Sequence, residues 1–381
     1  MNKKKVLVIA PFPPPMTGAA YISQEIVKKL VNEADVIEIG LQRGNLQSGS
    51  FSIFQSFRIL YIGIKILFLR FNSSKIDSVY MVISTSSWGN YRDIYLLSCI
   101  GSYLRSKMTI HSHGGNWDIM MNSKLKIIKK INKYLFKGVK NNIILGDYYL
   151  KMFNNYFINN SIVQKNFYGR VDELISKSEL TRKYNNLYPI RILFLSNLIP
   201  EKGYLELLDS FLSLPLAVSQ GLQLDFAGTF KYPQDEIYFL NKIKGKSNIF
   251  YHGHVSGILK NNLLKKAHLF CLPTKFVYEG QPVTILEAYS QGCIVATTIN
   301  GGISDIFENA INGLTINFSK KEGSSIELFI DSNNINSILS NLFIFVQYSG
   351  FKIGKNNLEY VKKHHDYDAY MKNICSIILN K

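Results

Sequence analysis

The stretch HLFCLPTKFVYEGQPVTILEAYSQGCIVATTINGGISDIFENAINGL, residues 268–314, carries the strongest structural signal in the sequence. Its first apolar run has strand character and ends at Pro273, where a loop begins. A helix is expected to start near Pro282, because proline is favoured in the first helical turn. Another β-branched run, residues 293–298, follows that helix, so the stretch indicates a strand, a helix and a second strand.

Two carboxylates lie eight residues apart in this stretch, at Glu279 and Glu287. Glu279 is expected in the loop, beside Gly280 and Gln281, whereas Glu287 is expected inside the helix. They therefore cannot form a pair on one helix face, and they can reach different parts of one ligand. A carboxylate accepts paired hydrogen bonds from vicinal hydroxyls, and the N–H groups at a helix N-terminus can face a phosphate.

The same alternation of short β-branched runs and longer helical patterns extends through the whole chain. It is typical of parallel sheets covered by helices on both faces. At 381 residues the chain is longer than one ordinary hydrophobic core supports, so two domains are expected. The runs expected to be strands are residues 5–10, 35–40, 76–84, 107–113, 141–145, 161–167, 190–196, 222–228, 248–254, 268–273 and 293–298.

A polar stretch, residues 176–189, separates the two sets of strands. The prediction is an N-terminal α/β domain of residues 1–185 and a C-terminal α/β domain of residues 186–365. Both are expected to be doubly wound, Rossmann-like sheets that face a central cleft. Residues 366–381 look helical and are expected to join the first domain. Because such sheets bind ligands outside the carboxyl ends of their strands, functional residues are expected in the loops that follow strands.

Composition is that of a folded protein, with 46 % apolar and 19 % charged residues. The four cysteines show no C-x-x-C spacing, so neither a disulfide framework nor a metal site is predicted, and a reducing cytosol fits best. The apolar run at 6–10 is too short for a signal-peptide core. The run at 59–71 falls short of the roughly 20 apolar residues that cross a bilayer, so no transmembrane helix is expected.

The chain carries 44 basic and 27 acidic residues, a formal net charge of +17, which favours an acidic partner. Residues 124–140 place seven lysines around an apolar set and predict a basic amphipathic helix. Such a helix can lie on an anionic membrane surface, or it can be a solvated face over an ordinary core. The apolar and basic stretch 51–71 also suggests a membrane surface or a lipid-linked acceptor. No nucleic-acid partner is predicted, since no nucleic-acid-binding module is present.

Two features of the first half could contact a ligand. Gly18 follows a proline-rich turn at the start of a helix, where backbone N–H groups can bind a phosphate or sugar oxygen, although such a glycine is often only a tight corner. His111 and His113 end a strand before a glycine pair. No third metal ligand lies nearby in the sequence, so a metal site is not favoured. His113 is better placed to donate or accept a hydrogen bond with a substrate hydroxyl or phosphate. The alternative is that His113 is an imidazole whose hydrogen bonds are satisfied within the loop.

The second half opens with a strand, a loop that holds Asn197, Lys202 and Gly203, and then a helix. An ammonium at the mouth of such a loop, beside the N–H groups of a helix N-terminus, can neutralise a diphosphate leaving group. An exposed lysine before a glycine is common, so this loop by itself is only a weak indication of a binding site. Its interpretation depends on the stretch at residues 268–314.

Taken in order, seven segments resemble the retaining GT-B glycosyltransferases of family 4. The resemblance extends over nearly the whole chain. The segments are PPPMTGAA (13–20), IHSHGG (110–115), SNLIPEKG (196–203), DFAG (225–228), YHGHV (251–255), EGQPVTILEA (279–288) and NGGISDIFENAINGL (300–314).

By position, the resemblance implies that Glu287 holds the nucleotide ribose and that Glu279 faces the donor sugar. It implies that Lys202 binds the diphosphate. The loop whose backbone lies near the sugar and the diphosphate matches four residues: Gly280, Gln281, Pro282 and Val283.

The resemblance also implies that Gly18 belongs to a loop that closes on the donor and that His113 lies near the reacting sugar. One position departs from the family, because many members have arginine where this chain has Asn197. Asn197 keeps a place in the donor site but cannot supply charge, so phosphate neutralisation must depend more on Lys202, on helix ends or on another basic residue.

The activity implied is transfer of a hexose or N-acetylhexosamine from a nucleotide-sugar, with a UDP-sugar favoured, to a glycan or lipid-linked acceptor. Transfer would retain the anomeric configuration and need no metal and no cofactor besides the donor substrate. The resemblance is to enzymes of bacterial polysaccharide synthesis. The protein is expected in the cytoplasm, or peripherally on the inner face of the cell membrane. A nucleotide-sugar epimerase or hydrolase, or a non-catalytic membrane-associated scaffold, remains an alternative.

Overall fold

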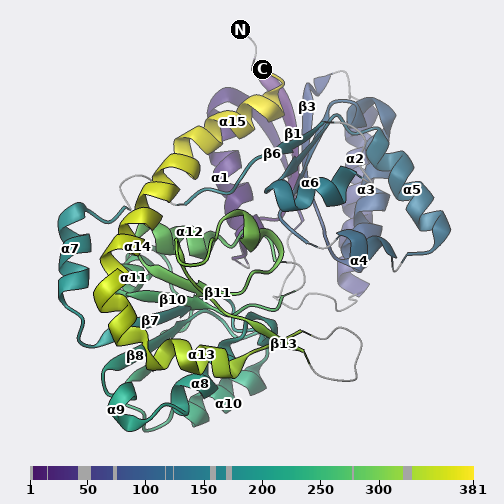
Figure 1. The fold of residues 1–381 in the computed structure, drawn as a ribbon. Helices are drawn as coiled ribbons and strands as arrows, with labels where there is room; N and C mark the ends of the chain where they lie inside the picture. The colour runs from purple at the N-terminus through teal and green to yellow at the C-terminus, as the bar shows by residue number, and fades with distance from the viewer. Residues whose placement is uncertain are drawn as a thin grey trace. The chain divides into compact units, whose positions relative to one another are not determined.

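The computed structural model of the protein describes residues 3–14, 16–41, 53–71, 75–115, 117–122, 124–154, 160–168, 174–276, 279–320 and 328–381. The chain divides into two compact units (Figure 1). Unit 1 is Met1–Asn166 with Asp368–Lys381, and unit 2 is Phe167–Tyr367. Each unit contains its own six-stranded parallel sheet, which agrees with the predicted fold class.

The sheet of unit 1 has the strand order β2-β1-β3-β4-β5-β6, and all its pairings are parallel. The two central strands, β3 and β4, are buried along their whole length, as expected of a parallel sheet covered on both faces. The strands are β1 (Lys4–Ala10), β2 (Ala34–Gly40), β3 (Ser78–Ile83), β4 (Met108–Ser112), β5 (Asn141–Ile144) and β6 (Ser161–Val163).

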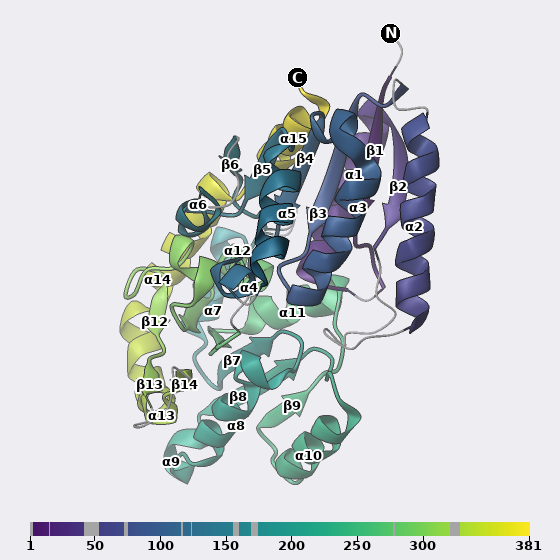
Figure 2. The same cartoon turned by 90° about the vertical axis from the view of Figure 1, so that its right-hand side faces the viewer.

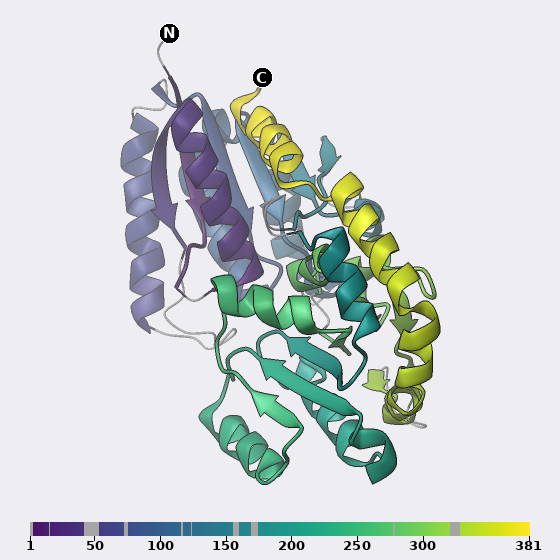
Figure 3. The same ribbon diagram turned by 90° about the vertical axis from the view of Figure 1, so that its left-hand side faces the viewer.

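Helices cover both faces of this sheet. Figure 3 shows α1 (Gly18–Glu33) and α15 (Tyr367–Leu379) on one face, and Figure 2 shows α2 (Ile53–Phe71), α3 (Ser87–Arg105) and α5 (Lys126–Lys137) on the other. The chain end is tied to α1, because Lys381 Nζ lies 2.7 Å from Glu33 Oε2. Two shorter helices, α4 (Trp117–Asn122) and α6 (Asp147–Asn154), complete the unit. Among the helices of the described residues, none is long and apolar enough to cross a bilayer.

The sheet of unit 2 has the order β12-β11-β10-β7-β8-β9. Its strands are β7 (Ile190–Leu195), β8 (Leu222–Ala227), β9 (Ile249–Tyr251), β10 (Leu269–Leu272), β11 (Ile294–Thr297) and β12 (Gly313–Thr315). A separate antiparallel pair is formed by β13 (Phe318–Lys320) and β14 (Leu328–Ile330). All eleven predicted strands are confirmed, whereas β12, β13 and β14, with three residues each, were not predicted.

The order of this second sheet decides which loops meet. β7 and β10 are direct neighbours, so the loops that follow them leave the same edge of the sheet side by side. The first loop contains the 3₁₀ turn η3 (Pro200–Lys202), and the second leads into α12 (Val283–Ser290). The predicted helix start near Pro282 is confirmed, because Pro282 is the N-cap of α12.

Other helices surround this sheet. They are α8 (Tyr204–Leu212), α9 (Leu216–Ser219), α10 (Pro233–Ile243), α11 (Gly257–Lys266), α13 (Ser332–Ser340) and α14 (Leu342–His364), with a further 3₁₀ turn, η4 (Gly301–Asp305).

The polar stretch at 176–189, which we expected to separate the domains, is partly a helix, α7 (Lys177–Asn185). Ser176 and Glu179 form a capping box at its N-terminus. Its buried residues, Leu180, Lys183 and Tyr184, pack within unit 2, so the boundary of the compact units lies before the helix and not after residue 185.

Lys183 explains why α7 belongs to this unit. Its buried ammonium donates hydrogen bonds to the carbonyls of Ala267, at 2.9 Å, and Gln291, at 2.6 Å, which cap the C-termini of α11 and α12. Helix C-termini carry negative partial charge and favour a cation. Burial lowers the pKa of the Lys183 ammonium, with an opposing contribution from Cys293. Because the stretch is polar, its sequence gives no sign that Lys183 is buried and binds helix ends.

Candidate functional site

Glycine allows the two loops that follow β7 and β10 to touch. Gly203 has a φ of +77°, and a Cβ there would lie 2.0 Å from the carbonyl oxygen of Pro273. Any larger residue would push the two loops apart. Lys202, the residue before this glycine, is thereby held against the end of β10.

Lys202 is bound by Glu279. Its ammonium donates to both carboxylate oxygens, at 2.8 Å to Oε1 and 2.6 Å to Oε2. The exposed fractions of the two side chains are 13 % and 6 %, so the pair is largely shielded from water. The ammonium also lies 5.1 Å from the centre of the Phe276 ring, a distance at which the ring attracts a cation.

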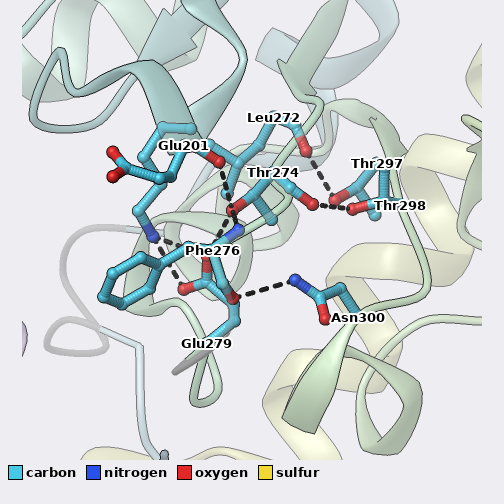
Figure 4. Close-up of polar contacts among 9 residues, drawn as sticks. Glu201, Leu272, Thr274, Phe276, Glu279, Thr297, Thr298 and Asn300 are labelled. Carbon is cyan, nitrogen blue, oxygen red and sulfur yellow. Dashed lines mark hydrogen bonds and ion pairs between the residues drawn. The ribbon is translucent and has the colours of Figure 1, made fainter. Parts of the chain in front are cut away.

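The position of Glu279 is fixed by its neighbours (Figure 4). The buried hydroxyl of Thr274 donates to Glu279 Oε2 at 2.7 Å. The backbone N–H of Gly302 donates to the carbonyl of Glu279 at 3.3 Å. Gly301, with a φ of +54°, comes so close that an added Cβ would lie 2.3 Å from the same carbonyl. The protein itself therefore holds the Glu279 carboxylate in position before any ligand binds.

Residues at the end of β11 and just after it support this loop through hydrogen bonds. Thr297 donates to the carbonyl of Leu272 at 2.8 Å, and Thr298 donates to the carbonyl of Thr274. Asn300 donates to the carbonyl of Phe276 at 2.9 Å. Figure 4 shows these contacts reaching from one loop to the other. The carbonyls of Leu272 and Phe276 also accept backbone N–H groups, from Thr274 and Glu279, so the loop is tied both within itself and to the end of β11.

Glu287, in α12, has a lysine partner of its own. Lys260 of α11 donates to Glu287 Oε1 at 2.6 Å, and the exposed fractions of the side chains are 26 % and 11 %. Among the described residues, none donates a hydrogen bond to Oε2 of Glu287, so that oxygen can accept one from a ligand. The sequence did not point to Lys260, because it lies 27 residues from Glu287 and among other lysines.

The remaining predicted residues of unit 2 belong to the same two loops. Asn197 follows β7, and its carbonyl accepts a hydrogen bond from Ile199. Gly280, Gln281, Pro282 and Val283 lead into α12, whose N-cap makes no side-chain hydrogen bond to the first turn. The N–H groups of that turn and the positive end of the helix dipole can therefore serve an anion.

Charge is balanced at this site. Two carboxylates, Glu279 and Glu287, are each neutralised by one lysine, Lys202 and Lys260. Unpaired carboxylates would repel an anionic ligand, and the lysines remove that repulsion. The arrangement can hold hydroxyls through carboxylate oxygens and an anion through ammonium groups and helix N–H groups.

Gly18 and His113 belong to unit 1, where each lies after a strand. Gly18 is the first residue of α1, whose N-cap Thr17 accepts a hydrogen bond from Ala20 N at 3.2 Å. An added Cβ at Gly18 would meet no atom of the described residues within 4 Å. The glycine thus leaves open space at a helix N-terminus and is not required by packing.

His113 lies against His111, with ring centres 3.9 Å apart. Nδ1 of His111 shares a 2.7 Å hydrogen bond with the hydroxyl of Tyr80. Both ring nitrogens of His113 are buried and find no hydrogen-bond partner among the described residues. Burial lowers the pKa of His113 to about 3, and burial with the neighbouring His113 lowers the pKa of His111. Both imidazoles are therefore neutral at neutral pH.

No metal centre is apparent in the part of the chain that the structure describes, where no three His, Cys, Asp or Glu side chains form a group that could hold an ion. The four cysteines are buried free thiols.

Several solved structures have this fold. HepE of Anabaena, in complex with UDP and glucose, is 13 % identical at a TM-score of 0.69, covering 99 % of this chain and 100 % of that chain. Sucrose-phosphate synthase of Thermosynechococcus elongatus is 10 % identical at a TM-score of 0.71, with coverages of 98 % and 97 %. WaaG, a glycosyltransferase involved in lipopolysaccharide biosynthesis, is 14 % identical at a TM-score of 0.68, with coverages of 98 % and 99 %.

These likenesses show that the protein has the GT-B fold of two parallel α/β units, as predicted. Residues 176–335 match the model of the family described as glycosyl transferases group 1. That range contains Lys202, Lys260, Glu279 and Glu287. Among curated protein sequences, none matches this chain.

The buried, unpartnered imidazole of His113 leads to a prediction about stability. Its folded-state pKa lies below the unfolded value of about 6.5, so its contribution to stability is present above pH 6.5 and is lost as pH falls towards 3. His113→Leu removes buried polar atoms that lack partners, so unit 1 should unfold with a free energy about 1 kcal/mol higher at pH 7. The advantage should grow by about 1.4 kcal/mol for each pH unit below 6.5.

Urea unfolding followed by tryptophan fluorescence measures this, because both tryptophans, Trp88 and Trp117, lie in unit 1. His111→Leu is the control, and it should lower stability because it removes the bond to Tyr80. A His113→Leu protein that is less stable than wild type at pH 7 would contradict the prediction.

Proposed function

We propose that the protein is a glycosyltransferase that moves a hexose or N-acetylhexosamine from a nucleotide-diphosphate sugar to an acceptor hydroxyl. The observation that carries this proposal is the preset Lys202–Glu279 pair beside the N-terminus of α12. The match of residues 176–335 to glycosyl transferases group 1 and the GT-B fold support it. The two lysine–carboxylate pairs match a ligand that carries both hydroxyls and a diphosphate.

Lys202 stabilises the leaving group in this proposal. As the bond from the sugar to the diphosphate breaks, negative charge grows on the diphosphate oxygen, and a fixed ammonium in a shielded site lowers the energy of that state. Because Asn197 carries no charge, Lys202 and the backbone N–H groups of Gly280, Gln281 and Val283 supply most of this stabilisation. Glu279 keeps the ammonium in place and faces the sugar.

Glu287 holds the ribose in this proposal. Lys260 occupies Oε1, which leaves Oε2 to accept a hydrogen bond from a ribose hydroxyl. The ammonium of Lys260 also offsets the charge of Glu287 near the anionic donor. Lys260 thus prevents Glu287 from adding to the negative charge that the donor brings to a site where Asn197 supplies no positive charge.

Transfer proceeds with retention of the anomeric configuration. The acceptor hydroxyl attacks the face from which the diphosphate departs, and a diphosphate oxygen takes the hydroxyl proton. The protein's contribution is to position the substrates and stabilise charge, so no bound metal and no further cofactor is needed. Gly18 and His113 keep the roles that the family resemblance implies, with His113 acting as a neutral hydrogen-bonding group.

The acceptor we propose is a glycan or a lipid-linked saccharide of bacterial polysaccharide synthesis, such as capsule, O-antigen or exopolysaccharide. The donor we propose is a UDP-sugar, and the reaction takes place in the cytoplasm. The similarity to HepE, solved with UDP and glucose, and to WaaG, a lipopolysaccharide glycosyltransferase, supports these choices.

A donor screen tests the proposal. Purified protein is given a panel of nucleotide-sugars, with and without candidate acceptors, and free nucleoside diphosphate is measured. A transferase releases the diphosphate faster when an acceptor is present. Release without any acceptor would indicate a hydrolase, sugar interconversion without release would indicate an epimerase, and neither turnover nor donor binding would indicate a non-catalytic scaffold.

Chelation of metal ions should leave the turnover unchanged, because Lys202 and helix N–H groups supply the positive charge that a metal would otherwise give. The measurement is the initial rate of diphosphate release with and without EDTA, with magnesium or manganese restored in a third sample. A rate that disappears with EDTA and returns with metal would overturn the metal-independent mechanism.

Lys260→Gln should weaken UDP binding about tenfold in calorimetry, or about 1.4 kcal/mol, because Glu287 then faces the anionic donor without a counter-charge. Lys265→Gln is the matched control, since Lys265 lies on the same helix and pairs with Glu179 at 2.9 Å. It should change the affinity less than twofold.

A double-mutant cycle identifies the cause. In a Glu287→Gln background, Lys260→Gln should weaken binding by much less than tenfold, because the charge that it neutralises is gone. An undiminished loss in that background would mean that Lys260 acts on the donor directly and not through Glu287.

A further inference from the structure

The helices α2, α3 and α5 form one layer on a single face of the unit 1 sheet (Figure 2). α2 approaches α3 closely at Gly63, where an added Cβ would lie 2.2 Å from the hydroxyl oxygen of Tyr95. α3 and α5 are joined by reciprocal hydrogen bonds between Asn90 and Asn132, at 2.8 and 3.0 Å. We call the solvent side of this layer the outer helical face.

α2 is apolar on both sides. Ile62 and Ile66 are buried against the sheet, as expected for a helix that covers a core. The opposite side should be polar, yet it is lined by large apolar residues, of which Phe68 and Phe71 are 68 % and 87 % exposed. The exposed set on α2 comprises Phe57, Leu60, Tyr61, Ile64, Leu67, Phe68 and Phe71.

The outer helical face carries positive charge and no exposed negative charge. Across the described residues of α2, α3 and α5, the single acid is Asp93, which is fully buried and paired with Arg92 at 2.6 Å. The exposed cations are Arg58, Lys65 and Arg70 on α2 and Lys126, Lys130, Lys133 and Lys137 on α5. A surface of this kind is complementary to an anionic partner.

Aromatic residues with a polar end lie on the same face. Trp88, 61 % exposed, lies beside Tyr91 at the start of α3, and the ammonium of Lys124 lies 3.7 Å from the centre of the Tyr91 ring. On α5, Tyr134 is 71 % exposed. Tryptophan and tyrosine favour the boundary between lipid and water, where the ring is apolar and its polar atom stays hydrated.

We infer that the outer helical face binds the surface of an anionic lipid membrane. α2 lies in the plane of the interface with its phenylalanines in the acyl region, while its cations and the lysines of α5 contact lipid phosphates. A protein partner fits less well, because protein interfaces are depleted in lysine. The inference rests on the proposed function and deepens it, because it names the surface on which the enzyme would reach a lipid-linked acceptor. Its test uses no donor, so the membrane inference and the proposed function can be refuted separately.

Vesicle co-sedimentation of the full chain tests the inference. Vesicles of phosphatidylcholine with phosphatidylglycerol should bind the protein, and vesicles of phosphatidylcholine alone should bind it at least tenfold more weakly. Added salt should weaken the binding to the anionic vesicles, because screening acts on the lysines. Equal binding to both kinds of vesicle, or none to either, would overturn the inference.

Variants locate the contact. Phe68→Ser with Phe71→Ser should weaken binding about tenfold, and so should Lys130→Gln with Lys133→Gln. The control is Ile237→Ser with Tyr238→Ser on α10 of unit 2, where the two side chains are 62 % and 54 % exposed. It should change binding less than twofold. Circular dichroism checks that every variant is folded, and a control as weak as the α2 variant would refute the location.

Trp88 offers a direct readout of depth. Brominated lipids in the anionic vesicles should quench its fluorescence, whereas Trp117 is fully buried and should stay unquenched. Quenching should therefore disappear in Trp88→Phe. Binding to the vesicles without quenching would refute this location of the membrane contact. Self-association that Phe68→Ser with Phe71→Ser abolishes in the absence of lipid would instead make the face a protein interface.

Discussion

The ion pair between Lys202 and Glu279 is the interaction on which the candidate site depends. A carboxylate with 6 % of its side chain exposed is stable only with a partner, and removing one member of such a pair costs roughly 3–5 kcal/mol. The fold provides that partner through its strand order, because β7 and β10 are neighbours and their loops leave one edge together. Gly203 and Gly301 then allow the approach that side chains would prevent.

Much of this framework could be predicted from the sequence. Apolar β-branched runs located the strands β1 to β11, and Pro282 located the start of α12, because these signals act over a few neighbouring residues. The helix α7 was missed because its surface is polar and only Leu180, Lys183 and Tyr184 face inward. The strands β12, β13 and β14 have three residues each, as β6 and β9 do, but they do not lie within the longer runs of strand character that located those two.

The ion-pair partners within the candidate site could not be predicted, because they are far apart in the sequence. Glu279 and Lys202 are 77 residues apart, and Glu287 and Lys260 are 27 apart, so their contacts depend on strand order and helix placement. The family resemblance indicated what Lys202, Glu279 and Glu287 do, but not that each carboxylate has its own lysine. Thr274, which fixes Glu279, gives no signal in the sequence.

The lysine side chains of this protein occupy two different environments. Lys202 and Lys260 are partly buried and each is bound by a carboxylate, so they serve precise positioning. Four of the five lysines of α5 are exposed on a helix without any acid, which suits attraction to an extended anionic surface. The two lysines of the site are balanced by carboxylates and add nothing to the net charge of +17, whereas the lysines of α5 contribute to it.

The most direct test of the central claim is calorimetric titration of UDP into wild type and two charge-pair variants. Lys202→Met with Glu279→Gln removes the pair without leaving an unpaired buried carboxylate. Lys275→Met with Glu206→Gln removes the pair beside it, which is closed at 3.0 Å. The account predicts at least a tenfold loss of affinity in the first variant, about 1.4 kcal/mol, and little change in the second. Equal affinity in all three proteins would contradict it.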